Sequence, residues 1–342
     1  MAVRRRLGLL ALTLSVGAMS TATSLAQGVA LQPAPATPAT SQGQGPATTS
    51  AQAVDPDAVL VEELVVVARD RGPAWWAVSN GTNTVYVLGA PSLAPKRTPW
   101  DLITLQRRLN GANAVILPFQ EVKVHLAGSL GAAWNLMRLR TSRPFEESLD
   151  PADRARFAAA REKIGQPAGR YKTNNALAAG LLLAGDYRDH SNLTNADTAK
   201  VVRAYAQMAK VPVVQKSYDI GPLMGAIIRT PKPAARACLE AVLEQVEAGP
   251  GATVAAARAW AQGDTPGALD NERTYERCIN MVPGAQTFDA RTKADQVSAI
   301  EKALKTPGHA IAVVQLRPLL AQGGVLDQLR AKGYQVKTPG EV

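Results

Sequence analysis

The 342-residue sequence predicts an α/β fold, in which strands from both ends of the folded region join one sheet. Two observations predict this class. β-Branched and aromatic residues flank an Asn-Gly pair at positions 80 and 81, and a continuous apolar run fills residues 309–315 near the other end. Between them, apolar residues recur mainly at helical spacing. Strands at both ends with helices between them favour a sheet assembled from distant segments.

The first two strands of this sheet are expected to form a hairpin. Residues 75–79 (WWAVS) and 84–89 (TVYVLG) enclose the Asn-Gly turn, which is the strongest short-range signal for a hairpin. Residues 62–67 (EELVVV) come earlier and predict either an edge strand or an ordered lead-in.

Helix starts are predicted at three places where a capping residue precedes an apolar repeat. These are Thr98, Asp150 and Thr194, each followed within three residues by an acidic residue. The first helix is expected to end at about Asn110, before Gly111. A helical insertion is expected from about 128 to 208. Further helices are expected over residues 176–184, 220–230, 234–247, 252–261, 275–281, 292–304 and 326–331.

The remaining strands are predicted from short apolar runs between turn residues. Residues 113–117 (NAVIL) form a buried strand that Pro118 ends, and residues 309–315 (HAIAVVQ) form another. Shorter strands are expected over 212–215 and 334–337.

The amino-terminal region has the features of an exported protein. Residues 1–26 combine three arginines, an apolar run of about 13 residues and a small-residue cleavage site, which predicts a signal peptide. A bilayer span needs about 20 apolar residues, so an uncleaved membrane anchor is the weaker alternative and no stable span is expected. Residues 27–57 are rich in Ala, Pro, Thr, Ser and Gln and predict a disordered linker. Residues 58–342 then form the folded domain.

The charge pattern argues against nucleic acid as a partner. The net charge of the chain is +10, and loss of three arginines with the signal peptide lowers it to +7. The charges are interspersed, whereas nucleic-acid binding requires a basic patch or stripe. We therefore expect a solvated surface with moderate positive charge.

The two cysteines, Cys238 and Cys278, are expected to form a disulfide. Export places the chain in an oxidising compartment, where an even number of cysteines favours pairing. Two separate buried thiols are the alternative. With no histidine nearby in the sequence, a metal site at these cysteines is not expected.

Four segments, taken in order, resemble the TraB/GumN family, also called TraB/PrgY/GumN, to which the animal Tiki proteases are related. They are the hairpin at 76–89, residues 95–119 ending in GANAVILPF, residues 193–220, and residues 310–336. Together with the pattern of elements, this resemblance implies a mixed central sheet with helices on both faces.

The resemblance also implies a reaction centre, and this sequence departs from it. In the family, histidines in two Gly-x-x-His-like turns at strand ends and an acidic residue would hold a divalent metal that activates water. Here Ser92 and Pro318 stand where the histidines are expected, Gln120 where the first acidic residue is expected, and Lys216 where a glutamate is expected. The degenerate motif positions are Gly89, Ser92, Pro118, Gln120, Lys216, Arg291 and Pro318, of which Arg291 matches a family arginine only loosely.

These departures predict a periplasmic, non-catalytic binding protein of the bacterial envelope, with no metal or cofactor. Its partner would be an envelope protein, a peptide or a small ligand. One alternative is a metal-dependent or altered-site hydrolase, for example around Ser92 with Arg291 or Arg317. Another is an interaction protein anchored by an uncleaved leader. Structural roles are expected for the three histidines and for four tryptophans, although the tryptophans could also line a cleft: His125, His190, His309, Trp75, Trp76, Trp100 and Trp134.

Overall fold

A computed structural model describes residues 72–118, 122–123, 134 and 137–342. The predicted signal peptide, the predicted linker and the possible strand at 62–67 lie outside the described residues. Within the described ranges, no helix is both long enough and apolar enough to cross a bilayer.

The predicted hairpin is confirmed. Strands β1 (Trp75–Ser79) and β2 (Thr84–Ala90) pair antiparallel, with Ser79 opposite Thr84. The Asn80 side chain closes the turn, because its Oδ1 accepts hydrogen bonds from the backbone N–H groups of Thr82 (3.1 Å) and Asn83 (2.8 Å).

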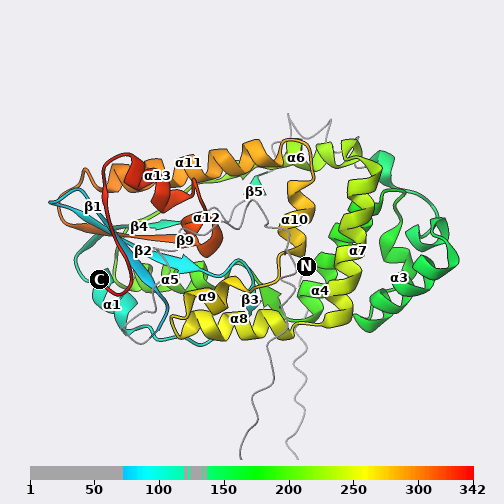
Figure 1. Cartoon of the computed structure of the whole chain (residues 1–342), viewed down its shortest axis with the longest axis horizontal. Helices are drawn as coiled ribbons and strands as arrows, with labels where there is room; N and C mark the ends of the chain where they lie inside the picture. Colours follow the sequence, from blue (N-terminus) through cyan, green and yellow to red (C-terminus); the bar gives the residue numbers. More distant parts are fainter. Residues whose placement is uncertain (1–71, 119–121, 124–133, 135–136) are drawn as a thin grey trace, which may run out of the picture. The chain divides into compact units, whose positions relative to one another are not determined.

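The hairpin belongs to a six-stranded mixed sheet with the order β10-β1-β2-β9-β4-β7 (Figure 1). Strands β2, β9, β4 and β7 run parallel to one another, while β1 is antiparallel to both of its neighbours. Both ends of the folded region therefore contribute strands, as the sequence predicts. The remaining strands are β4 (Ala112–Leu117), β7 (Val213–Gln215), β9 (His309–Gln315) and β10 (Gln335–Lys337).

Helices cover both faces of the sheet, which confirms the expected layering. One face packs against α11 (Ala285–Ala303), α12 (Leu316–Leu320) and α13 (Val325–Ala331), around buried Trp76, Val87 and Ala312. The other face packs against α1 (Ile103–Leu109) and α5 (Asp197–Met208), around buried Leu88, Ile311 and Val313. Successive side chains of β2 and β9 therefore point into the cores on opposite faces of the sheet, because side chains alternate in direction along a strand.

The expected helical insertion is present and forms a core of its own, at the right of Figure 1. Its boundaries differ from the predicted 128–208. Helix α5 packs on the sheet instead, because it lies in the connection between the parallel strands β4 and β7. Later helices complete the insertion. Its main helices are α3 (Pro151–Lys163), α4 (Ala176–His190), α7 (Lys232–Ala248) and α10 (Thr274–Asn280).

The shorter elements connect these cores. Helices α6 (Gly221–Ala226), α8 (Gly251–Ala261) and α9 (Thr265–Leu269) lie between β8 and α10 in the chain. Two-stranded sheets pair β3 (Ala94–Pro95) with β6 (Leu193–Thr194), and β5 (Val122–Lys123) with β8 (Tyr218–Asp219).

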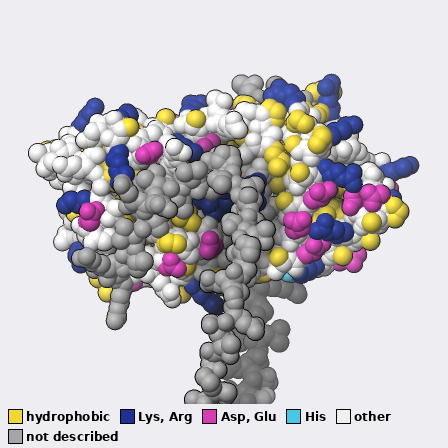
Figure 2. Space-filling model, viewed as in Figure 1, with side chains coloured by type: hydrophobic (Ala, Val, Ile, Leu, Met, Phe, Trp, Pro, Cys, Tyr) yellow, Lys and Arg dark blue, Asp and Glu magenta, His cyan; other side chains and the backbone are white. Residues whose placement is uncertain are grey.

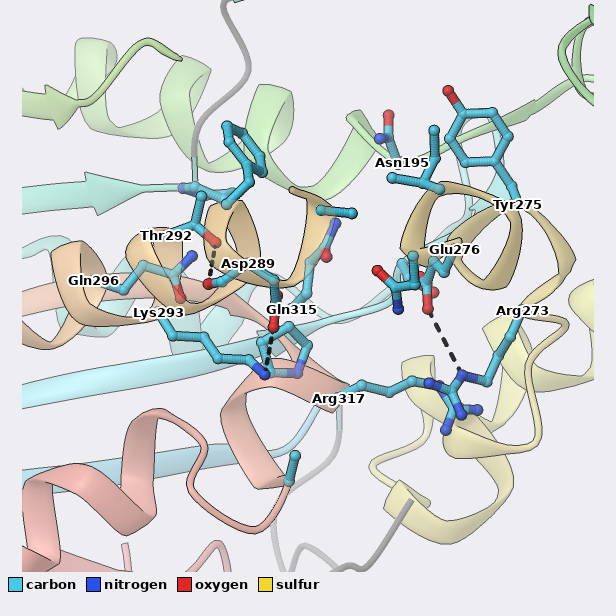
Figure 3. Close-up of a pocket in the computed structure, with 18 of the residues that line it drawn as sticks. Asn195, Arg273, Tyr275, Glu276, Asp289, Thr292, Lys293, Gln296, Gln315 and Arg317 are labelled. Atoms are coloured by element: carbon cyan, nitrogen blue, oxygen red, sulfur yellow. Dashed lines mark hydrogen bonds and ion pairs between the residues drawn. The ribbon is translucent and has the colours of Figure 1, made fainter. Parts of the chain in front are cut away.

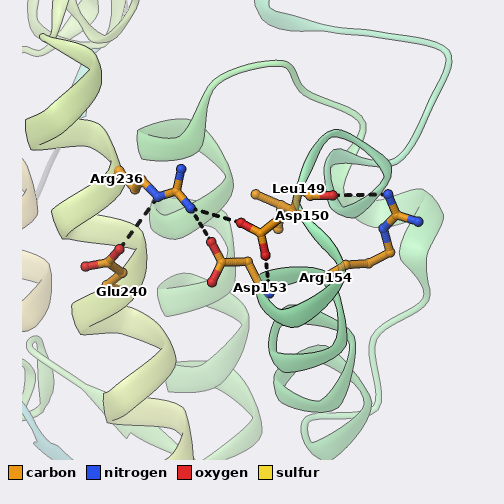
Figure 4. Close-up of polar contacts among 6 residues, drawn as sticks. All are labelled: Leu149, Asp150, Asp153, Arg154, Arg236 and Glu240. Atoms are coloured by element: carbon orange, nitrogen blue, oxygen red, sulfur yellow. Dashed lines mark hydrogen bonds and ion pairs between the residues drawn. The ribbon is translucent and has the colours of Figure 1, made fainter.

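One of the three predicted helix caps is confirmed. Asp150 caps α3 by accepting a hydrogen bond from the backbone N–H of Asp153, and Arg236 of α7 contacts both carboxylates (Figure 4). The hydrogen bond from the Asp153 backbone is the main reason why the pKa of Asp150 lies below its usual value, and Arg236 adds to it.

The other two caps were predicted wrongly. Helix α1 begins at Ile103, because the Thr98 hydroxyl donates to the carbonyl of Pro95 and Asp101 accepts from the N–H of Ile103. Helix α5 begins at Asp197, whose carboxylate accepts from the distant N–H of Arg97 instead of capping the helix.

The predicted disulfide is confirmed. Cys238 of α7 and Cys278 of α10 are bonded, with their Cα atoms 5.2 Å apart, and both side chains are buried in the helical core. The bond therefore ties together two helices of the insertion that lie far apart in the sequence.

Candidate functional site

A cavity of about 550 Å³ opens where the parallel strands end. The pairing of Ala90 with Gln315 places the carboxyl ends of β2 and β9 side by side, and β4 runs parallel to β9 on its other side. Pro118 directly follows β4, Ser92 lies two residues after the end of β2, and Pro318 lies three residues after the end of β9, within α12. All three line the cavity. Open α/β sheets commonly bind ligands outside the carboxyl ends of their strands.

The opposite wall of the cavity comes from the helices. Helix α11 contributes residues at helical spacing, which places Asp289, Thr292, Lys293 and Gln296 along one side in Figure 3. The remaining residues of this wall come from α4, the segment before α5, α10 and the first turn of α11. They are Arg188, Asn195, Ala196, Arg273, Tyr275, Glu276, Ile279, Asn280, Ala285 and Phe288.

Gly89 has a packing role beside this cavity. It lies in β2, and a Cβ at this position would meet the Trp76 ring at 2.8 Å and the side chain of Leu316 at a closer distance still. Its carbonyl accepts a hydrogen bond of 2.6 Å from the indole N–H of buried Trp260. The glycine of the motif is therefore explained by close packing at the end of the strand.

The predicted motif positions separate into two groups. Ser92, Pro118 and Pro318 come together at the cavity, whereas Lys216 and Arg291 are not among its lining residues. Lys216 forms a 2.6 Å ion pair with Asp295, and the Arg291 guanidinium lies 5.9 Å from the ring centre of Tyr218. Gln120 lies outside the described residues.

Asp295 organises the second group. Its carboxylate accepts a 2.6 Å hydrogen bond from the Tyr218 hydroxyl in addition to the ion pair with Lys216. Burial disfavours the charged carboxylate, but the hydrogen bonds from Lys216 and Tyr218 outweigh burial and lower the pKa of Asp295. The positive charge of Lys216 is therefore engaged in holding β8 and the segment before it against α11.

The residues at the motif positions do not fit the metal that the resemblance implies. Proline has no side-chain donor, and a neutral serine hydroxyl is a poor ligand beside imidazole or carboxylate. The two carboxylates that line the cavity are each paired with a cation, Glu276 with Arg273 (3.8 Å) and Asp289 with Lys293 (2.7 Å). Across the described ranges, no three His, Cys, Asp or Glu side chains gather as a metal site would require.

The two histidines that the structure describes, His190 and His309, are not among the residues that line the cavity. The ring of His309 is at the amino end of β9, where its Nε2 lies 2.8 Å from the carbonyl oxygen of Arg108. His190 is exposed at the end of α4, and His125 lies outside the described residues. Of the four tryptophans, Trp75 and Trp76 are buried in the core and Trp134 is exposed.

The cavity is rich in arginine, which the sequence interpretation largely missed. Among the residues that the structure describes, four cationic side chains line it, Arg188, Arg273, Lys293 and Arg317, against two acidic ones. Of these four, the sequence indicates only Arg317, because it follows the last long strand. The other three come from α4, the start of α10 and α11, and no sequence spacing relates these positions.

Comparison with known proteins identifies the family. Residues 74–338 match the model of the TraB/PrgY/gumN family. No curated protein and no solved structure matches the chain significantly. The family match spans nearly all of the described sheet, helices and cavity, and the chain therefore belongs to the TraB/PrgY/gumN family.

Proposed function

We propose that this chain is an exported, non-catalytic member of its family that binds a ligand in the bacterial envelope through the cavity at the strand ends. The observation that carries the proposal is the chemistry at the three strand ends. They open on a cavity of about 550 Å³, yet the residues there are Ser92, Pro118 and Pro318. A cavity of this volume suits a small molecule or a short peptide.

The surroundings of Ser92 support binding over hydrolysis. A serine nucleophile needs a positioned general base within hydrogen-bond reach. The described lining residues include no histidine, and the two carboxylates are already held in ion pairs. Arg317 donates to the carbonyl groups of Leu269 and Asn271, and a guanidinium does not act as a base at neutral pH.

Export is the second part of the proposal, and it is supported by the amino-terminal sequence and the disulfide. Edman sequencing of protein from the periplasmic fraction should begin close to residue 27. An intact leader in the membrane fraction would instead favour an anchored interaction protein.

The catalytic question is tested by zinc titration and by incubation with a peptide library. The wild-type chain is expected to bind no stoichiometric zinc and to cleave no peptide. A Ser92→His/Pro318→His double variant is the matched control, because it returns imidazoles to the motif positions and should gain zinc affinity. Turnover by the wild-type chain, with or without metal, would overturn the proposal in favour of a hydrolase.

A further inference from the structure

We infer that the cavity binds the carboxylate or phosphate group of a small organic anion, held by Arg188, Arg273 and Arg317. This inference rests on the proposed binding function and specifies the chemical class of the ligand. The argument begins with the placement of the three arginines.

Arg273 and Arg317 approach the cavity from opposite sides. In Figure 3, Arg317 extends from α12 and Arg273 from the start of α10, and the two side chains point toward each other. Arg317 reaches the carbonyl groups of Leu269 and Asn271, close in sequence to Arg273. Two convergent guanidinium groups repel one another, and an oxyanion between them would relieve this repulsion through charge-assisted hydrogen bonds.

Arg188 adds a third positive charge from the helical wall. Its guanidinium stacks 3.9 Å above the ring centre of Tyr275, which leaves the edge of the guanidinium plane to donate hydrogen bonds. Its Nε is buried and has no hydrogen-bond partner among the described residues, and no carboxylate there lies within ion-pair distance. Arg188 lines the cavity, and a bound oxyanion would give its guanidinium the negative partner that the described residues do not supply.

The acidic residues do not cancel this charge. Among the described lining residues, Glu276 and Asp289 are the two carboxylates, against four cationic side chains. Asp289 pairs with Lys293 and Glu276 pairs with Arg273, which leaves an excess of two positive charges. The lining therefore has an excess of positive charge in a partly enclosed space, where electrostatic attraction is stronger than in water.

The other lining residues indicate which chemical groups the ligand carries besides its oxyanion. Tyr275, Ile279, Phe288 and Pro318 offer apolar contacts next to the arginines. Asn195, Gln296 and Gln315 also line the cavity, and their amide side chains can pair with N–H or O–H groups of a ligand. Hydroxy acids, short peptides and sugar or glycerol phosphates all combine an oxyanion with such donors.

The test is titration calorimetry on the purified chain with four probes: citrate, the dipeptide Ala-Ala, its carboxyl-terminal amide, and glycerol phosphate. Citrate, glycerol phosphate and the zwitterionic dipeptide each carry an oxyanion group, and at least one of these three is expected to bind with a dissociation constant below about 1 mM, about 4 kcal/mol of binding free energy. If the dipeptide is that ligand, its amide, which lacks the carboxylate, should bind at least about tenfold more weakly, the loss expected for a charge-assisted hydrogen bond. Citrate and glycerol phosphate then show whether carboxylate or phosphate is preferred.

Arg188→Gln is the diagnostic variant, and Arg156→Gln is its matched control. Arg188→Gln should weaken binding about ten- to hundredfold. Its melting temperature should fall only by the small amount expected from loss of the stacking on Tyr275. Arg156 pairs with Glu247 on the surface of the helical region, and its loss should leave affinity unchanged. Arg273→Gln is the second test. A substitution of Arg317 is less informative, because Arg317 also holds the segment around Leu269 and its loss would disturb the fold.

The outcomes separate this inference from the proposed function. Equal binding of the dipeptide and its amide, or wild-type affinity in both arginine variants, would overturn the oxyanion inference and leave a binding protein of another specificity. If citrate, glycerol phosphate and the dipeptide all fail to bind, the oxyanion inference is also overturned. Peptide turnover would instead overturn the proposed function itself.

Discussion

Gly89 lies between two packed side chains, the Trp76 ring from β1 and Leu316 from α12. Gly89→Ala should therefore destabilise the fold by roughly 1–3 kcal/mol, the usual cost of forcing an extra group into a packed core. Urea denaturation followed by circular dichroism measures this change.

Gly185 offers the matched control within the same chain. It lies inside α4, and a Cβ there would meet nothing within 4 Å. Gly185→Ala should stabilise the protein by about 0.5–1 kcal/mol, because alanine loses less backbone entropy in a helix. Equal effects of the two substitutions would contradict the packing role of Gly89.

Asp295 gives the fold a measurable dependence on acid. Its pKa in the folded state lies below the unfolded value, so its contribution to stability is complete above the unfolded pKa of about 3.9. That contribution is lost as the pH falls through the lower folded pKa. Asp295→Asn should reduce stability at pH 7 by about 1–2 kcal/mol and flatten the decline below about pH 4.

Denaturation midpoints from pH 7 down to pH 2 test this expectation, with Asp289→Asn as the control. Asp289 pairs with Lys293 within one helix and is more exposed than Asp295, so Asp289→Asn should lower stability at pH 7 by less than Asp295→Asn. An unchanged profile for Asp295→Asn would show that the contacts with Lys216 and Tyr218 contribute nothing to stability.

At the scale of elements, the sequence predicts best what depends on neighbouring residues. The hairpin follows from its Asn-Gly turn, and β9 has the predicted bounds because its apolar run is continuous. Helix starts were harder to predict. The Thr98 hydroxyl donates to the nearby carbonyl of Pro95 instead of capping α1. Asp197, three residues after the predicted cap Thr194, accepts from the distant backbone N–H of Arg97.

The disulfide between α7 and α10 should contribute strongly to stability. It closes a loop with a sequence separation of 40, and the loss of chain entropy in the unfolded state corresponds to about 4 kcal/mol. A Cys238→Ser/Cys278→Ser double variant should therefore show a markedly lower denaturation midpoint. Dithiothreitol should reproduce the effect in the wild type and leave the variant unchanged, and equal midpoints for the two proteins would contradict this role.

At the scale of the molecule, the sequence predicts the strand-end side of the site but not the side formed by the helical insertion. Parallel strands end at the same edge of a sheet, so the convergence of Ser92, Pro118 and Pro318 follows from topology. Arg188 and Arg273 belong to the insertion, and their place in the cavity depends on how a separate helical core docks onto the sheet. Nothing in the local sequence encodes that docking.

The cavity lies between these cores, and α11 connects them. Its first residue, Ala285, packs in the helical core, while Val297 and Ile300 pack against the sheet. Saturation with the tightest of the anionic probes should therefore stabilise both cores together, by about 2.7 kcal/mol at a concentration of one hundred times the dissociation constant.

Thermal unfolding monitored with citrate, or with whichever probe binds best, checks this coupling. The midpoint temperatures measured by tryptophan fluorescence and by far-ultraviolet circular dichroism should rise by the same amount. An upward shift confined to one signal would show that the ligand contacts only one of the two cores.

The position of Cys278 links redox chemistry to ligand recognition. Cys278 lies on α10 between Tyr275 and Ile279, both of which line the cavity, and Arg273 precedes the same helix. Without the disulfide, only packing would hold α10 against α7. Reduction of the bond should therefore weaken the affinity of the cavity for its ligand, even where the fold itself survives.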